Sequence, residues 1–462
     1  MGGARASGVV GALCAAVAAV VAAFALSAGR TATAAPENPA MAAVHEGVAS
    51  CAGSSCHSRQ VDSGVNVRQN ELITWQDPAS LAGAHSRAYK VLYEGRGQAI
   101  IRRMGLSSDG VARQCLGCHA DPAPAGLRGA KFQLSDGVGC ESCHGGSRNW
   151  LASHRAVEGT HANNVARGMR ALENPKVRAG VCLDCHFGGS RQGQFVSHEI
   201  MAAGHPRVGF ELDLFSSLQQ HWDVDADYVK RKGYAGGVKT WAVGQAMALE
   251  RALTLYSEQS RGRGAFPELY FFDCHSCHRQ ISDDPKARPQ WQANPGRPIP
   301  SGTPPFNDEN MIMLSAAARV TAPGLANRLD ADSRAFHAAL ARDRSESFRA
   351  AAKLAGTARA LSDAFAVRSF SRAETLAMID LILQGEISRR YTDYTGSAQA
   401  VMAADTLLNA LVAAGQADRG AVDRIRPNLD RAYAQVRDPN AYRPEAFRAS
   451  LAQVAQAARS LR

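Results

Sequence analysis

Beyond Arg30, the sequence has no apolar run of the roughly 20 residues that a membrane-spanning helix requires, which excludes a multi-pass membrane protein. Aromatic residues account for only 6% of the 462 residues, so aromatic side chains can supply little of a core. Cysteine is absent after residue 277, and residues 310–462 contain a single histidine, His337. This excludes a cysteine-based cofactor site from the last third of the chain and favours a structural role for His337.

The N-terminus carries the one long apolar segment. Arg5 precedes an alanine-rich stretch from about Val9 to Ala28, and the small residues Ala32-Thr33-Ala34 follow it. This order is typical of a secretory signal with its cleavage site, so residues 1–34, with Cys14, are predicted to be a signal peptide of a periplasmic protein. An uncleaved N-terminal membrane anchor is the alternative, because the stretch is also long enough to span a bilayer.

The other ten cysteines fall into five short clusters, and each cluster ends in histidine. Two thiols can add to the two vinyl groups of one porphyrin while the adjacent imidazole binds its iron. In four clusters two residues separate the cysteines, which places all three side chains on one face of a helical turn; the first cluster needs two more residues looped out. The pattern predicts five covalently attached haem c groups, with iron, at Cys51-x4-Cys56-His57, Cys115-x2-Cys118-His119, Cys140-x2-Cys143-His144, Cys182-x2-Cys185-His186 and Cys274-x2-Cys277-His278.

Two other interpretations of the clusters are weaker. Structural zinc needs four ligands and usually a second cysteine pair close by, whereas each cluster repeats the same isolated trio. A redox-active dithiol does not explain why histidine follows every pair.

The second axial ligand of each iron must come from elsewhere in the chain. A histidine there gives a six-coordinate, electron-transferring haem, whereas a vacant face admits substrate. His198 and His205 are seven residues apart, so on a helix they would share a face and point toward neighbouring haems. His154 follows the third cluster closely, and His275 is expected to pack beside its haem or face solvent. Nine histidines are available: His45, His85, His154, His161, His198, His205, His221, His275 and His337.

A proline-rich segment divides the chain. Seven prolines between Asp283 and Pro305 prevent regular structure there. Before this linker the helices look short, and five macrocycles would supply the core that side chains do not, so folding should depend on haem insertion. After it, helical periodicity covers Ala373–Arg389 and Ser397–Ala414, with a capping box at Ser371 and Glu374. The predicted fold is mainly α: signal peptide 1–34, haem-packed cytochrome domain of short helices and loops 35–282, linker 283–309, and haem-free α-helical bundle 310–462.

These features together resemble the cytochrome c-554 type of multihaem c cytochrome, and more closely a pentahaem subgroup with an extended first motif. The resemblance covers most of residues 45–292. It implies that the histidines at matching positions are the distal ligands, namely His85, His154, His198, His205 and His221, and that all five haems are bis-histidine haems. Which distal histidine serves which haem is left open. The matching segments are Glu71–Leu92, Gly137–Gly145, Trp150–His154, Ser197–Leu212 and His221-Trp222.

Proteins of this type include electron carriers and enzymes that act on small nitrogen compounds. The leading hypothesis is periplasmic electron transfer between periplasmic or membrane redox proteins through closely packed haems, with no catalytic residue. The alternative is an oxidoreductase of nitrite, hydroxylamine or a sulfur oxyanion at one open haem, for which the unusual first motif is the candidate. No lysine-terminated attachment motif, as in pentahaem nitrite reductases, occurs. A tethered quinol dehydrogenase rests only on the N-terminal stretch, and nothing specific favours a sensor.

The formal net charge of +10 falls to +8 when Arg5 and Arg30 leave with the signal peptide. Haem propionates would bring the holoprotein much nearer to neutrality, so a nucleic-acid partner is not expected. The C-terminal helical domain is instead expected to dock a redox partner or to support oligomer formation.

Overall fold

The computed structural model describes residues 43–63, 67–189, 191–258, 268–278, 294–300 and 303–462. Within these ranges the regular structure is helical, apart from two isolated bridges, His45 with Arg128 and Phe272 with Phe306. The prediction of a mainly α fold is therefore confirmed. No described helix is both long and apolar enough to cross a membrane. The predicted signal peptide lies outside the described residues.

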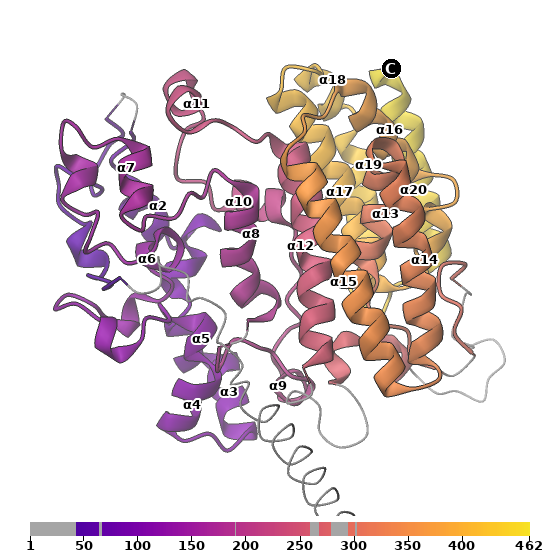
Figure 1. The fold of residues 1–462 in the computed structure, drawn as a ribbon, viewed down its shortest axis with the longest axis horizontal. Helices are drawn as coiled ribbons and strands as arrows, with labels where there is room; N and C mark the ends of the chain where they lie inside the picture. Colours follow the sequence, from indigo (N-terminus) through magenta and orange to yellow (C-terminus); the bar gives the residue numbers. More distant parts are fainter. Residues whose placement is uncertain (1–42, 64–66, 190, 259–267, 279–293, 301–302) are drawn as a thin grey trace, which may run out of the picture.

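The N-terminal half consists of short helices joined by long connections (Figure 1). Several begin at a side-chain cap, since Ser107, Thr160, Ser197 and Asp225 each accept a hydrogen bond from a backbone N–H of the first turn. The helices are α2 (Glu71–Gln76), α3 (Gly95–Arg103), α4 (Ser108–Gln114), α5 (Leu116–His119), α6 (Cys140–His144), α7 (His161–Ala166), α8 (Pro175–Leu183), α9 (His198–Ala202), α10 (Leu212–Leu218) and α11 (Ala226–Lys232).

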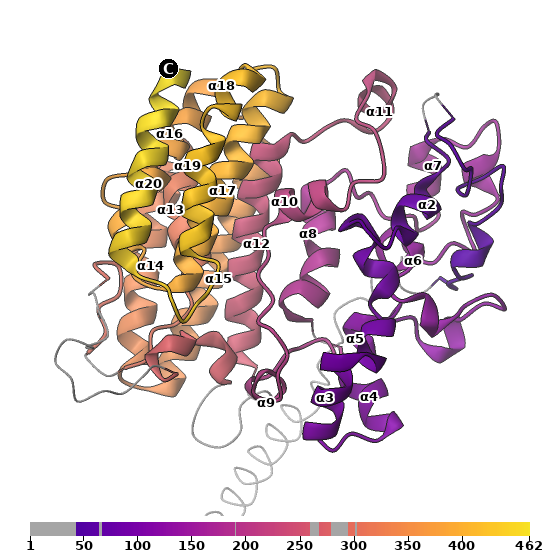
Figure 2. The same cartoon turned by 180° about the vertical axis from the view of Figure 1, so that it is seen from behind.

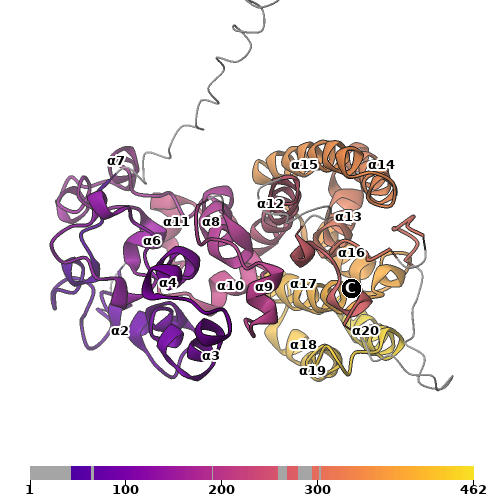
Figure 3. The same ribbon diagram turned by 90° about the horizontal axis from the view of Figure 1, so that it is seen from below.

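Long helices form a bundle in the C-terminal half (Figures 2 and 3). Its core is one continuous apolar cluster that includes the fully buried Trp241, Phe306, Phe336, Phe365 and Phe447. The bundle comprises α12 (Gly237–Ser257), α13 (Glu309–Thr321), α14 (Pro323–Leu340), α15 (Arg344–Ala366), α16 (Arg372–Leu383), α17 (Tyr394–Ala413), α18 (Arg419–Asp423), α19 (Arg426–Gln435) and α20 (Pro444–Ala458).

Helix α12 joins the two halves. It packs against α15, α13 and α17 of the bundle on one side and against α8 on the other. A small second core of Ala179, Leu183, Phe210, Leu212 and Ala248 lies at this junction. The predicted domain limits remain a prediction. The bundle core includes residues of α12, which precedes the proline-rich linker.

The start of α16 agrees with the sequence prediction, whereas its end does not. The capping box of Ser371 and Glu374 is present at the start of α16. That helix ends at Leu383, short of the predicted Arg389, because Gly385 takes a φ of +80° and turns the chain. Residues 294–300 contain no helix, as the prolines predict, whereas Pro285 and Pro289 lie outside the described residues.

His337 on α14 predicts a pH dependence of stability. The side chain is fully buried, and its Nδ1 donates to the Ser333 carbonyl oxygen at 2.8 Å. Burial lowers the pKa of His337 to about 4, and the nearby Asp308 opposes this effect while Arg297 and Arg390 add to it. The unfolded chain therefore binds a proton more readily between pH 6.5 and 4, so stability should fall as the pH drops through this window, by roughly 3 kcal/mol in total.

The matched variant is His337→Gln, which keeps a polar side chain but does not titrate. Thermal unfolding followed by far-UV circular dichroism should show a smaller loss of melting temperature between pH 7 and pH 4.5 in the variant than in the parent protein. Equal losses in both proteins would contradict the prediction.

Candidate haem-binding sites

Every attachment histidine lies opposite one of the five predicted distal histidines. The space between the two rings of each pair is about what one metal ion bound to both rings would need. Each histidine belongs to one pair only. The centroid distances are 6.3 Å for His57 and His154, 6.2 Å for His119 and His205, 6.3 Å for His144 and His221, 6.0 Å for His186 and His85, and 5.9 Å for His278 and His198.

This spacing fits a metal ion held between two imidazoles. A metal–imidazole bond of about 2.0–2.1 Å on each side leaves the two ring centroids roughly 6 Å apart. Rings in direct stacking contact would not leave that space. The residues therefore fit five bis-histidine haem irons. No group of three or more His, Cys, Asp or Glu side chains that could hold a metal ion occurs among the described residues.

Hydrogen bonds orient half of these imidazoles. A backbone carbonyl can only accept, so a ring nitrogen bonded to one carries the proton and leaves the other nitrogen free to bind a metal. In five of the ten rings Nδ1 is engaged in this way, or by a carboxylate. The acceptors are Ala88 O for His119 (2.7 Å), Leu151 O for His154 (2.7 Å), Pro206 O for His205 (2.7 Å), Gln219 O for His221 (3.1 Å) and Glu71 Oε2 for His57 (2.9 Å).

Burial also keeps two of the attachment histidines in the form that binds a metal. It lowers the pKa of His144 to about 3 and that of His186 to about 4. Both imidazoles are thus neutral at pH 7, and a neutral imidazole has the lone pair that a metal requires.

None of the ten motif cysteines forms a disulfide, so both thiols of each motif remain for one porphyrin. Four motifs lie on a turn of helix: on α5, on α6, at the end of α8, and on a 3₁₀ turn at Cys274–Ser276. The first motif is the exception, since residues 51–57 form a non-helical turn in which the Cys56 amide donates to Gly53 O. This is the expected place for the two additional residues.

Contacts between motifs show which of them are neighbours. The second and fourth motifs touch, because Cys118 Sγ lies 4.0 Å from Cys185 O and Cys185 Sγ lies 3.7 Å from Gly117 O. The first and third also touch, and a hydrogen bond from the Cys140 thiol lowers the pKa of Cys51.

Two further observations show which attachment motifs lie close together. The charge of Cys143 contributes to the raised pKa of Cys182, although burial is the larger cause, so the third and fourth motifs adjoin. His198 begins α9 and His205 follows its end, which brings the partners of the fifth and second motifs together. The first motif therefore adjoins the third, the third adjoins the fourth and the fourth adjoins the second, while the distal histidines of the second and fifth motifs flank the same short helix.

The four remaining histidines have different surroundings. His45 Nδ1 lies 2.9 Å from Asp121 Oδ2, His161 Nε2 lies 2.9 Å from Glu173 Oε1, and His275 Nδ1 lies 3.8 Å from Asp273 Oδ1. His337 is held in the bundle. The ring of His275 is partly exposed and lies 6.2 Å from that of Tyr394. Sequence reasoning missed Glu71 as the partner of His57, since nothing in the sequence joins the two.

Comparison with known proteins supports the chemistry of the first three sites. Residues 50–145, which hold the first three motifs, match the family model described as cytochrome c554 and c-prime. Cytochrome c-554 of Nitrosomonas europaea is 32% identical over 108 residues, which are 22% of this chain and 39% of that protein. The chain thus spans about two fifths of the length of this relative. No solved structure matches. The two similarities support c-type cytochrome chemistry, with covalently bound haem c, in this part of the chain.

Proposed function

We propose that this protein is a periplasmic pentahaem c-type cytochrome that transfers electrons between redox partners through five bis-histidine haems. The five histidine pairs carry the proposal, because each pair would hold one haem iron between its two imidazoles. In order of the motifs, the ligand pairs are His57 with His154, His119 with His205, His144 with His221, His186 with His85, and His278 with His198.

Bis-histidine ligation suits electron transfer better than catalysis. Haem iron supplies one-electron oxidation and reduction when bound. The paired histidines would bind each iron from both sides and so would leave no face for a substrate. Hydrogen bonds to Nδ1 hold five of these imidazoles in place. Enzymatic turnover of nitrite or hydroxylamine would instead need one iron with an open position.

The order of the motifs supports a linear path. At one end, Cys56 of the first motif is exposed, and at the other end Cys277 of the fifth motif is exposed, whereas the other eight cysteines are partly buried. We propose that electrons enter at one exposed end and leave at the other. The three motifs between them would set spacing and potential.

Spectra of the oxidised holoprotein test this function. Mass measurement should give five covalent haems, and electron paramagnetic resonance should show only low-spin signals that nitrite, hydroxylamine and cyanide leave unchanged. A high-spin component that shifts on addition of a ligand would identify an open iron and would favour the oxidoreductase instead.

Glu71→Gln should raise the reduction potential of one haem. The Glu71 carboxylate accepts from His57 Nδ1 and makes this ligand a stronger donor, which favours ferric iron. Its loss should raise the potential by roughly 30–60 mV, equivalent to a three- to tenfold weaker preference for the ferric state. Spectroelectrochemical titration of all five haems measures the shift.

Glu173→Gln is the matched control for this variant. Glu173 pairs with His161, which faces no attachment histidine, so its replacement should leave all five potentials unchanged. Equal shifts in the two variants, or none in either, would contradict the assignment of His57 as a haem ligand.

A further inference from the structure

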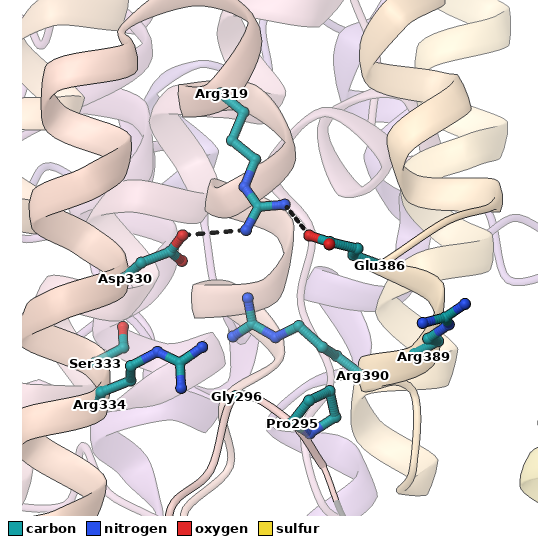
Figure 4. A pocket seen from close by; sticks show the side chains of 9 residues that line it. All are labelled: Pro295, Gly296, Arg319, Asp330, Ser333, Arg334, Glu386, Arg389 and Arg390. Atoms are coloured by element: carbon teal, nitrogen blue, oxygen red, sulfur yellow. Dashed lines mark hydrogen bonds and ion pairs between the residues drawn. The ribbon is translucent and has the colours of Figure 1, made fainter.

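A pocket of about 220 Å³ opens on the helical bundle, away from the first four motifs (Figures 1 and 4). It lies between the end of α13, the middle of α14 and the segment that follows α16. Four arginines line it, together with Ser333 and Gly296, and Figure 4 shows the guanidinium of Arg390 pointing into its middle. The arginines are Arg319, Arg334, Arg389 and Arg390.

Arg390 is a buried cation without a carboxylate partner. It is 7% exposed, and its Nη1 donates to Ser315 Oγ at 2.9 Å, while its Nε has no hydrogen-bond partner. Among the described residues, no carboxylate oxygen lies within 4.0 Å of its guanidinium. Buried arginines are almost always paired, as Arg297 is with Asp308 and Asp393 in the same bundle.

The two acids of the pocket form no ion pair with Arg390, although the charge of Asp330 acts on it and Ser315 Oγ links the two side chains. Asp330 and Glu386 both pair with Arg319, at 3.1 and 3.6 Å. Arg334 and Arg389 add two exposed cations at the rim. Four arginines thus face two carboxylates that are already engaged, and the pocket carries an excess of positive charge.

Two features of the floor indicate room for a ligand. Ser333 is buried, and its hydroxyl has no hydrogen-bond partner. Gly296 keeps the edge of the Arg390 guanidinium clear, because a Cβ atom at this position would lie 2.8 Å from Arg390 Nε. Two residues that line the pocket thus each carry a buried donor without a hydrogen-bond partner, Arg390 at Nε and Ser333 at Oγ.

We propose that this pocket binds a small inorganic oxyanion, such as phosphate or sulfate. Arg390 and Ser333 would donate from the floor, and Arg334 and Arg389 from the rim. Guanidinium groups bind tetrahedral oxyanions through paired, charge-assisted hydrogen bonds. The volume is below the roughly 300–1,000 Å³ of pockets for drug-sized molecules, which favours a small anion. The proposal does not depend on the electron-transfer function.

Calorimetric titration and thermal melting of the holoprotein with phosphate and sulfate test the site, with chloride at matched ionic strength as reference. We expect saturable binding and a rise in melting temperature beyond that in chloride. The double variant Arg334→Gln, Arg389→Gln should bind at least tenfold more weakly. Its control, Arg424→Gln with Arg437→Gln, removes the same charge from exposed positions of the bundle and should bind as the parent does.

Arg390→Gln and Ser333→Ala should also weaken binding. If Arg390→Gln does not fold, the double variant Arg334→Gln, Arg389→Gln, here called the rim variant, still tests the site. A response to phosphate and sulfate no greater than to chloride would overturn the proposal. So would equal affinities of the rim variant and its control. Tighter binding of a glutamate-rich peptide than of phosphate would overturn it in favour of a protein carboxylate as the ligand.

Discussion

Replacing His154 with alanine is expected to turn one haem, that of the first motif, high-spin at neutral pH. His154 faces His57 at 6.3 Å, with the two rings within 10° of parallel, and Trp150 packs edge-on against it at 5.4 Å. Alanine removes one axial ligand and leaves a space beside Trp150 that a small molecule can occupy. Electron paramagnetic resonance should show one high-spin iron for four low-spin ones, and that iron should bind cyanide.

Added imidazole should restore the ligand that the variant lacks. It should fill the space left by His154 and return the iron of the first motif to the low-spin state, which general disruption of the fold would not permit. The matched control is His161→Ala, a histidine seven residues later that pairs with Glu173 instead of an attachment histidine. Five low-spin haems in His154→Ala, or a high-spin haem in His161→Ala, would refute the pairing.

The attachment residues could be predicted from sequence because their chemistry is local. Two thiols and an imidazole that bind one porphyrin must be neighbours in the chain, so their spacing is visible. The pairing of distal ligands depends on long-range packing instead. His85 faces His186, which comes much later, whereas His154 faces His57, which comes earlier. No local pattern encodes such contacts. Position in the chain suggested His154, His198 and His205 as ligands, and the resemblance added His85 and His221.

The same distinction holds for the fold. Ser371 and Glu374 are three residues apart and predict the start of α16 correctly, since a capping box is a local device. The position of α12 could not be predicted, because this helix precedes the proline-rich linker and still packs into the bundle. Its buried Trp241 and Leu249 belong to the same core as Phe336 and Phe365, which follow the linker.

Replacing Arg297 with methionine should destabilise the bundle by about 3–5 kcal/mol, the cost of breaking a buried ion pair from one side. Arg297 is 9% exposed, and its guanidinium bonds to the carboxylates of Asp308 and Asp393. Asp308 precedes α13 and Asp393 precedes α17, so the arginine ties together the starts of two core helices. Methionine would leave two buried carboxylates without their cation.

Chemical denaturation followed by far-UV circular dichroism measures this loss, with Arg359→Met as the control. Arg359 pairs with Glu250 at 2.6 Å but its side chain is 62% exposed, and a surface pair of this kind contributes about 0–1 kcal/mol. Both variants remove one arginine from the bundle, but Arg297 loses two buried ion pairs and Arg359 loses one exposed pair. The difference between the two variants therefore reports the effect of the buried pairs.

The pH dependence separates this cause from a packing defect. In the parent protein Arg297 lowers the pKa of Asp308, although burial alone would raise it. Without the arginine, burial favours the protonated form of Asp308, and protonation removes the uncompensated charge. The loss of folding stability in Arg297→Met should therefore become smaller as the pH falls toward 5. A deficit that is the same at pH 5 and pH 8 would show that the arginine acts by filling space, and the electrostatic explanation would then be wrong.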